Sequence, residues 1–290
     1  MSEGILTPTA TREALARLGI KPNRNLGQNF LIDGNIVRKS LQFADVSDGD
    51  IAIEIGPGLG TLTLALLARG AIVYAVEIDR TLHRHLNDTI LQKYSNRFFS
   101  VLGDAVKIPL AGYSPSRIVG AGTTDCLPSN VKVVANLPYA VATPWLGRIL
   151  SGPLPACLCI MVQKEAADRY LAVPGGKSFS AITIFLQSAY DTVDTHAVSR
   201  SCFTPKPAVD SVLLNLVRRR SVFRFSSEGQ ATIRRLFAHR RKQIGALTRG
   251  RANLQPWLEL LRRAGFDHKV RPEMIPVALW TDLERSLPES

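Results

Sequence analysis

The sequence predicts an α/β fold with a mainly parallel central sheet, followed by a small all-helical C-terminal domain. From residue 51 onward, apolar runs alternate with helical stretches in the order IAIEI, TLTLALLAR, AIVYAVEI and TLHRHLNDTILQKY. This alternation of strand and helix is typical of parallel sheets. The C-terminal quarter instead shows apolar residues at helical spacing among many basic ones. A length of 290 residues with 46% hydrophobic composition fits two domains.

The segment before this alternation predicts a short helix. Leu15 and Leu18 are spaced to share one helix face, and a polar loop follows Ile20. Further strands are predicted by near-continuous apolar runs at residues 98–102, 131–135 and 157–162, a pattern that fits burial on both faces of a sheet.

The end of the sheet domain is predicted to contain a helix and a strand. The helix covers residues 180–190, and the strand covers residues 211–219 after a proline-containing loop. We therefore place a boundary near Arg219, with residues 1–219 as the sheet domain and 220–290 as a basic helical domain. Residues 111–130, which are rich in Gly, Pro, Ser and Thr, are expected to form a surface loop.

Positive charge is concentrated in the second domain. Residues 218–290 contain 16 Lys and Arg against 7 Asp and Glu, whereas residues 1–217 contain 20 against 17. Such a concentration favours a polyanionic partner such as RNA, because neutralised phosphates release counterions. A solubilising surface is the alternative. One helix is expected to bury the side formed by Ile233, Leu236, Phe237, Ile244 and Leu247. Its candidate RNA contacts are Arg240, Arg241 and Lys242.

Several classes of protein are disfavoured. No run approaches the roughly 20 apolar residues that span a bilayer, and the N-terminus lacks the pattern of a secretory signal. We therefore expect a cytoplasmic protein without a membrane partner. The four cysteines form no C-x-x-C pair, and His83 and His85 face different directions on a helix. No metal site is predicted.

A glycine-rich turn predicts a bound cofactor. In IEIGPGLGTLT, glycines 56, 58 and 60 follow a strand and precede a helix, where absent side chains let the backbone approach a ligand. A nicotinamide-binding G-x-G-x-x-G turn would need glycine at Thr61. The next predicted strand ends in Glu77, whose carboxylate can accept hydrogen bonds from ribose hydroxyls. Asp104 follows a third strand and can accept a bond from an adenine amine, although capping of the next element is an equal alternative.

The tetrapeptide Asn136-Leu137-Pro138-Tyr139 follows a further apolar strand. The Asn136 side chain offers a carbonyl acceptor, and Pro138 has no amide donor, so backbone carbonyls here remain available to accept. Two acceptors can hold one exocyclic amine, and Tyr139 offers a ring face on which a purine can stack. An ordinary Asn-x-Pro turn at the end of a strand is the alternative.

Together with these motifs, further segments of the sequence resemble the bacterial small-subunit ribosomal RNA adenine dimethyltransferases. The matching segments follow the chain in order: NLGQNFLID at 25–33, EIGPGLGTLT at 54–63, VEID at 76–79, GDA at 103–105, NLPY at 136–139, QKEAADR at 163–169, FTPKPAVDS at 203–211 and FAHRRKQI at 237–244. The resemblance implies a Rossmann-like S-adenosylmethionine-dependent methyltransferase domain and dimethylation of the N6 amines of two adjacent adenosines. It implies small-subunit ribosomal RNA within the immature small subunit as partner, and we expect a monomer.

The same resemblance implies roles for individual residues. The implied cofactor-binding residues are Asn29, Leu31, Gly56, Glu77, Asp104 and Asn136. The target amine would be held by the Asn136 side chain and a backbone carbonyl near Leu137, with Pro138 in the same turn. Tyr139 and Phe203 would flank the target base.

Three segments differ from the sequence typical of the family, and two other functions are alternatives. Residues 140–144 are less polar than the family text, SFSAI at 178–182 replaces a Tyr-Gly segment, and the 111–130 loop is long. One alternative is a non-catalytic ribosome assembly factor that binds RNA. The other is a large-subunit ribosomal RNA adenine methyltransferase of the macrolide-resistance type.

Overall fold

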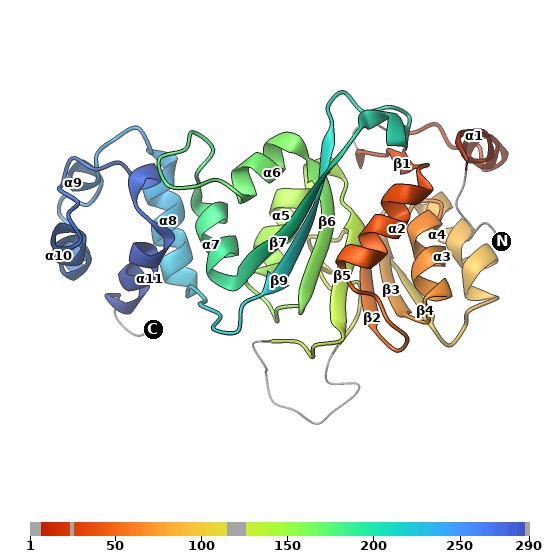
Figure 1. Ribbon diagram of the computed structural model, residues 1–290, viewed down its shortest axis with the longest axis horizontal. Coiled ribbons are helices and arrows are strands. Elements are labelled where there is room, and N and C mark those ends of the chain that lie inside the picture. Colours follow the sequence, from red (N-terminus) through yellow and green to blue (C-terminus); the bar gives the residue numbers. More distant parts are fainter. Residues whose placement is uncertain (1–6, 24–25, 115–125, 288–290) are drawn as a thin grey trace. The chain divides into compact units, whose positions relative to one another are not determined.

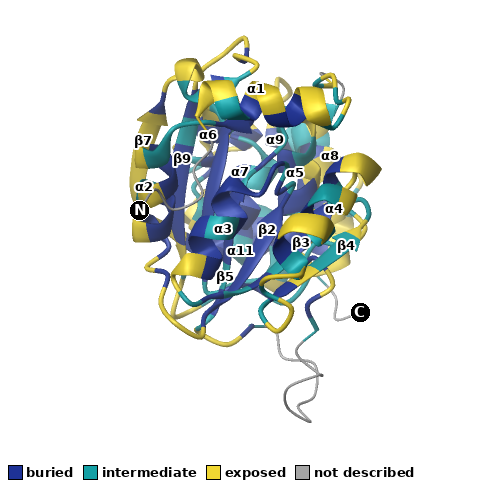
Figure 2. Ribbon diagram, turned by 90° about the vertical axis from the view of Figure 1, so that its right-hand side faces the viewer, coloured by how far each residue is buried: buried dark blue, intermediate teal, exposed yellow. Residues whose placement is uncertain are grey.

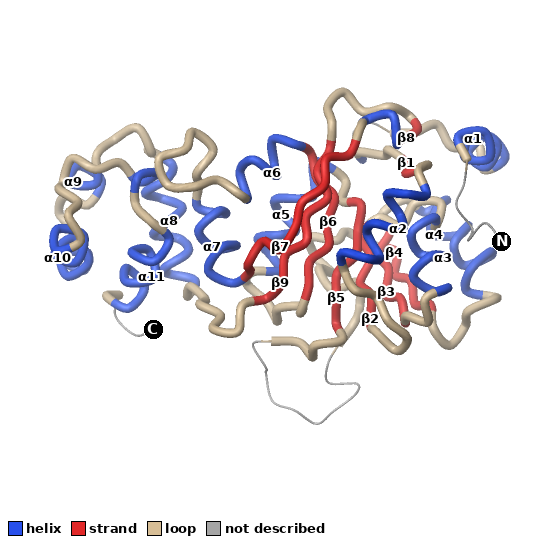
Figure 3. Tube along the Cα trace, viewed as in Figure 1, coloured by secondary structure: helices blue, strands red, loops and turns tan. Residues whose placement is uncertain are grey.

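The computed structural model describes residues 7–23, 26–114 and 126–287. The chain divides into two compact units, the first formed by Met1–Ala166 and Thr192–Arg218 and the second by Ala167–Asp191 and Arg219–Ser290. Figures 1 and 3 show that the first unit holds the sheet and that the second is helical. The expected fold class, a Rossmann-like α/β domain with a helical C-terminal region, is confirmed.

The first unit is built on a seven-stranded sheet in the order β4-β3-β2-β5-β6-β9-β7. Its strands are β2 (Ile51–Ile55), β3 (Ile72–Glu77), β4 (Phe98–Leu102), β5 (Val131–Asn136), β6 (Cys157–Gln163), β7 (Tyr190–Val198) and β9 (Ser211–Arg218). Strands β2 to β6 pair in parallel, and β9 pairs antiparallel with β6. The strands expected at 98–102, 131–135, 157–162 and 211–219 are thereby confirmed, whereas β7 was not expected.

Two helices precede this sheet in the sequence, and the others follow its strands. These helices are α1 (Pro8–Arg17), α2 (Gly34–Phe43), α3 (Thr61–Ala68), α4 (Arg80–Leu86), α5 (Tyr139–Ile149) and α6 (Lys164–Tyr170), which extends into the second unit. From the central strand β2, α3 leads to β3 on one side, whereas α5 leads from β5 to β6 on the other. Right-handed crossovers in opposite directions place helices on opposite faces, and Figure 1 shows α2 and α3 in front of the sheet.

Burial explains why the central strands are apolar. Every residue of β2 is buried, and β5 and β6 are nearly so, because helices cover both faces (Figure 2). The point where the strand order reverses lies between β2 and β5. In open α/β sheets this point leaves a crevice at the carboxyl ends of the strands, where ligands bind.

The helical unit contains α7 (Ala181–Ala189), α8 (Ser227–Ala238), α9 (Ile244–Leu247), α10 (Gln255–Arg263) and α11 (Val277–Arg285). Its core includes the Trp257 and Trp280 rings, whose centroids are 5.1 Å apart. The unit also takes in residues 167–191, which differs from the boundary expected at Arg219. Aromatic contacts explain the difference, because the ring of Phe185 on α7 lies 5.4 Å from that of Phe225.

The single helix expected across residues 233–247 is wrong. Helix α8 ends at Ala238, and α9 begins at Ile244. The first turn of α9 is held by a distant segment, since the Ile244 amide donates to the Val270 carbonyl at 2.8 Å and the Gly245 amide to that of His268 at 2.9 Å. Residues 240–242 therefore form the connection between two helices.

Of the expected surface loop at 111–130, residues 115–125 lie outside the described residues. The four cysteines are free thiols. In the described ranges, no three His, Cys, Asp or Glu side chains gather as a metal site would require. None of the helices described is long and apolar enough to cross a membrane.

Candidate active site

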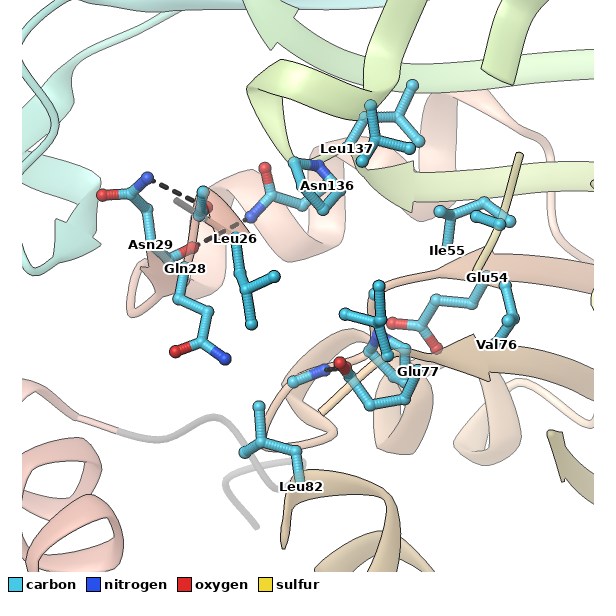
Figure 4. Close-up of a pocket in the computed structure, with 18 of the residues that line it drawn as sticks. Leu26, Gln28, Asn29, Glu54, Ile55, Val76, Glu77, Leu82, Asn136 and Leu137 are labelled. Atoms are coloured by element: carbon cyan, nitrogen blue, oxygen red, sulfur yellow. Dashed lines mark hydrogen bonds between the residues drawn. The ribbon is translucent and has the colours of Figure 1, made fainter. Parts of the chain in front are cut away.

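A pocket lies at the carboxyl ends of β2, β3, β4 and β5, all within the first unit. The N-terminal segment, residues 26–31, supplies another part of its lining, and Figure 4 shows side chains from these elements around one space. The pocket brings together nine of the sequence-predicted site residues. They are Asn29, Leu31, Gly56, Glu77, Asp104, Asn136, Leu137, Pro138 and Tyr139.

The glycine turn between β2 and α3 is left-handed at each glycine. The φ angles of Gly56, Gly58 and Gly60 are 66°, 61° and 83°. Residues with a Cβ rarely adopt this region. A Cβ on Gly60 would also lie 2.6 Å from Ile90 Cδ1. The glycines are thus required for the conformation of the turn, and the turn lines the pocket.

Glu77, the last residue of β3, is fixed by that turn. Its Oε2 accepts a hydrogen bond from the Gly58 amide at 3.1 Å, and its Oε1 accepts one from the Asp79 amide at 3.0 Å. The side chain is 5% exposed, and burial raises its pKa. Two bonds leave further lone pairs on this carboxylate, so it can still accept from ligand hydroxyls.

Asp104, which follows β4, forms a local turn and also lines the pocket. Its Oδ1 accepts from the Val106 amide at 2.8 Å, which is local turn formation. The residue is only half-buried and lines the pocket. Its remaining acceptor capacity is available to a ligand amine.

Glu54 is a pocket residue for which the sequence predicted no role. It interrupts the apolar strand β2, is 2% exposed, and accepts a hydrogen bond from Thr63 Oγ1 at 2.7 Å. Burial, and to a lesser extent the charge of Glu77, raise the pKa of Glu54 to about 8, against the lowering effect of the Thr63 bond. A carboxyl group inside an otherwise apolar strand was the signal that could have identified it.

The Asn136 side chain is oriented by the N-terminal segment. Its Nδ2 donates to the Asn29 carbonyl oxygen at 3.2 Å, and Asn29 Nδ2 donates to the Gly27 carbonyl at 3.1 Å (Figure 4). The bond to Asn29 orients the Asn136 amide, and its Oδ1 remains available as an acceptor. No described residue donates a hydrogen bond to the Leu137 carbonyl. Two acceptors therefore lie next to each other in the sequence at the end of β5.

Tyr139 begins helix α5 beside these acceptors. Its hydroxyl is hydrogen-bonded to Ser211 Oγ at 2.9 Å, which fixes the ring. The ring is half-buried and lines the pocket. Burial raises the pKa of the Tyr139 phenol, so it stays neutral at physiological pH.

Phe203 is not brought to the pocket, in contrast to the expected flanking position. Its side chain is 3% exposed and belongs to the apolar core of the unit. The short strand β8 (Phe203–Thr204) pairs antiparallel with β1 (Phe30–Leu31), with Leu31 opposite Phe203. Phe203 therefore positions the pocket wall formed by Leu31.

The ionisable side chains that line the pocket are acidic. Its lining includes the carboxyl groups of Glu54, Glu77 and Asp104, and no Lys, Arg or His from the described residues. A dinucleotide would bring phosphates into this acidic surface without a counter-charge. The lining instead fits a cationic ligand that carries hydroxyl and amine donors.

The candidate RNA contacts lie in the helical unit. Arg240 is half-buried, and Arg241 and Lys242 are exposed in the connection that follows α8. None of them pairs with a carboxylate of a described residue. These cations are available to phosphates, but from a loop rather than a helix face.

Comparisons with known proteins agree with one another. The family model for ribosomal RNA adenine dimethylase matches residues 19–281. Ribosomal RNA small subunit methyltransferase A of Opitutus terrae is 54% identical over 96% of this chain and 98% of its own. That of Moorella thermoacetica is 37% identical over 98% and 99%.

Solved structures show the same fold. The dimethyladenosine transferase of Plasmodium falciparum matches with a TM-score of 0.69 and 26% identity, covering 88% of this chain and 95% of its own. The 23S rRNA methyltransferase ErmE matches with a TM-score of 0.63 over 89% and 99%, at an identity of 22% that shows the fold alone. The chain belongs to the ribosomal RNA adenine dimethylase family.

Proposed function

We propose that this protein is an S-adenosylmethionine-dependent methyltransferase that dimethylates the N6 amines of two adjacent adenosines in small-subunit ribosomal RNA. Family membership and the relatives named as small-subunit methyltransferases support it. The observation in the site that carries it is the Asn136 side chain, which donates to the Asn29 carbonyl and leaves its Oδ1 available to accept, next in sequence to Leu137 in the pocket lining.

The pocket fits the proposed methyl donor by the chemistry of its lining. S-adenosylmethionine carries a sulfonium and an ammonium group, ribose hydroxyls and an adenine amine, and the lining supplies carboxylates without a competing cation. We assign the methionine part to the turn at Gly56, the ribose to Glu77 and the adenine amine to Asp104. Asn29 and Leu31 border the donor from the N-terminal segment. When bound, this donor supplies a methyl group that is already activated for displacement.

The protein's own contribution is alignment of the target amine. Asn136 Oδ1 and the Leu137 carbonyl accept the two amine hydrogens and hold the nitrogen lone pair toward the donor. Positioning of this kind converts a bimolecular reaction into a nearly unimolecular one. After the first transfer one hydrogen remains, for which one of the two acceptors suffices. The same site thus serves both methylations.

The target base must leave its stack to reach these acceptors. Unstacking costs a few kcal/mol, and stacking on the Tyr139 ring contributes about 1–3 kcal/mol in compensation. The bond from Tyr139 to Ser211 holds the ring in place for this contact. Because Phe203 is buried, its part in the reaction is to position Leu31.

Further parts of the proposal concern the substrate. The basic helical domain would contact RNA phosphates through Arg240, Arg241 and Lys242, none of which pairs with a carboxylate of a described residue. We further propose that the RNA is met within the immature small subunit, and that the protein is a cytoplasmic monomer. Ultracentrifugation of the purified protein tests whether it is a monomer.

The decisive experiment uses small subunits from cells that lack the protein. Incubation with protein and S-adenosylmethionine should produce N6,N6-dimethyladenosine in nucleoside mass spectrometry, and primer extension should place it at two adjacent positions of the small-subunit RNA. Binding to the subunits without any methylation would identify a non-catalytic assembly factor. Methylation of large-subunit RNA instead would identify an enzyme of the macrolide-resistance type.

A further inference from the structure

The buried acid Glu54 is a titratable group that the mechanism above does not use. It lies on β2 two residues before Gly56, and its carboxyl group is directed to the same pocket as that of Glu77 (Figure 4). Thr63 Oγ1 donates to its Oε2 at 2.7 Å. No described residue donates to its Oε1, although the side chain is only 2% exposed. This oxygen is therefore an acceptor on a buried side chain that is open to a partner from the ligand.

No cation of the described protein faces Glu54. The charged groups around it are Glu77 at the end of β3 and Asp104 after β4, while α3 and the N-terminal segment contribute only uncharged side chains to the pocket. Burial is the largest effect on this group and raises its pKa to about 8. In the ligand-free protein at neutral pH, Glu54 is accordingly a neutral acid.

The charge of the ligand changes during the reaction. The methyl donor carries a positive sulfonium, whereas S-adenosylhomocysteine, the product, carries an uncharged thioether in the same place. The ammonium and carboxylate groups are common to both. A positive charge brought into a pocket with three carboxyl groups and no cation favours the ionised form of the neutral one.

We propose that Glu54 gives up its proton to solvent when S-adenosylmethionine binds and keeps it when S-adenosylhomocysteine binds, so that this side chain selects the donor over the product. The O–H bond of the acid breaks, the proton passes to the buffer, and the carboxylate would offset the positive charge that distinguishes the donor from the product. The inference rests on the proposed function, because it concerns the methyl donor of that reaction.

Linkage predicts how affinity depends on pH. While Glu54 is neutral in the free protein and ionised in the complex, affinity for the donor rises by up to about tenfold per pH unit. Affinity for the product stays nearly constant over the same range. The range from pH 6 to pH 7 suits the test, because it lies below the pKa of about 7.7–8.0 typical of an α-amino group such as the one both ligands carry.

Titration calorimetry in buffers of different ionisation enthalpy measures the protons released. At pH 7 we expect close to one proton released per donor bound to the wild-type protein and almost none per product bound. In Glu54→Gln, neither ligand should release a proton, and the ratio of donor to product affinity should lose its pH dependence. Glu13→Gln, an exposed change on α1, is the matched control and should behave as wild type.

A second variant tests the same idea without changing the acid. Thr63→Val removes the hydrogen bond that favours the ionised form of Glu54, so the pH range in which donor binding releases a proton should move to higher values. This variant decides the matter if Glu54→Gln does not fold. A proton count that is equal for both ligands, or a pH range of proton release that is unchanged in Thr63→Val, overturns the inference.

The outcomes also separate this inference from the proposed function. If the donor binds with no proton released, the selection by Glu54 is refuted while the methyl donor itself stands. If neither ligand binds the wild-type protein, both proposals fall.

Discussion

Replacing Asn136 with alanine removes a tether and an acceptor together. The tether is the 3.2 Å bond from Nδ2 to the Asn29 carbonyl, a neutral hydrogen bond worth about 0.5–1.5 kcal/mol. The acceptor is Oδ1, which we assign to the target amine. Loss of one preorganised contact to a reacting group costs about 10²–10³-fold in rate in other enzymes. We therefore expect Asn136→Ala to lower the rate by about 10²–10³-fold. Its free energy of unfolding should fall by no more than the value of the hydrogen bond to Asn29.

The assay is single-turnover transfer of labelled methyl groups to unmethylated small subunits, with protein and donor in excess. Asn130→Ala is the matched control, because Asn130 lies just before the opposite end of β5 and its Nδ2 donates a long hydrogen bond, of 3.4 Å, to the Gly49 carbonyl. It should react at the wild-type rate. Wild-type transfer by Asn136→Ala would refute the assignment, as would a loss that disappears when the donor is saturating.

Four further changes follow from the structure. Glu77→Ala should weaken binding of the methyl donor by about 1.5–3 kcal/mol, roughly 10- to 150-fold, measured by calorimetry. Gly60→Ala should lower the free energy of unfolding in urea by about 1–3 kcal/mol, because of its φ of 83° and the 2.6 Å approach to Ile90. Neutralising the cations of residues 240–242 should flatten the dependence of RNA affinity on salt, by about 0.7–0.9 in logarithmic slope for each phosphate that is no longer neutralised. Glu54→Gln should raise the free energy of unfolding at pH 9 but not at pH 4. Folding raises the Glu54 pKa from 4.5 to about 8, so the acid costs the wild-type protein nothing below pH 4.5 and destabilises it increasingly as the pH rises to 8.

Controls for these changes are present in the same chain. Gly147→Ala on α5 introduces a Cβ with no atom within 4 Å and should leave stability nearly unchanged. Neutralising Arg262 and Arg263, which already pair with Glu259 on α10, removes charge from a different part of the helical unit. An equal change of salt slope in that variant would show that total charge, rather than the 240–242 connection, decides RNA affinity.

Features that depend on neighbouring residues could be predicted from the sequence. The glycines at 56, 58 and 60 marked a turn that the structure makes left-handed at each of them. The acids Glu77 and Asp104 follow apolar strands, and parallel strands bring their carboxyl ends to one edge. Local pattern and a general rule of topology together led to one pocket.

Features that depend on distant contacts could not be predicted. The partner of Asn136 is Asn29, 107 residues earlier, and no local pattern records that bond. The break between α8 and α9 depends on backbone bonds to residues 268–270. The ring of Phe203 looked available to a base because its burial depends on a core assembled from the whole unit.

The pairing of β1 with β8 affects the order in which the protein can fold during its synthesis. Leu31 is matched with Phe203, so the two halves of this small ladder are made far apart in time. At a synthesis rate of about 5–20 residues per second, the later half leaves the ribosome roughly 10–35 s after the earlier one. Until then the nascent chain contains the glycine turn, but β1 lacks its strand partner β8. The pocket wall at Phe30 and Leu31 therefore gains its strand partner only when the sheet domain is almost complete.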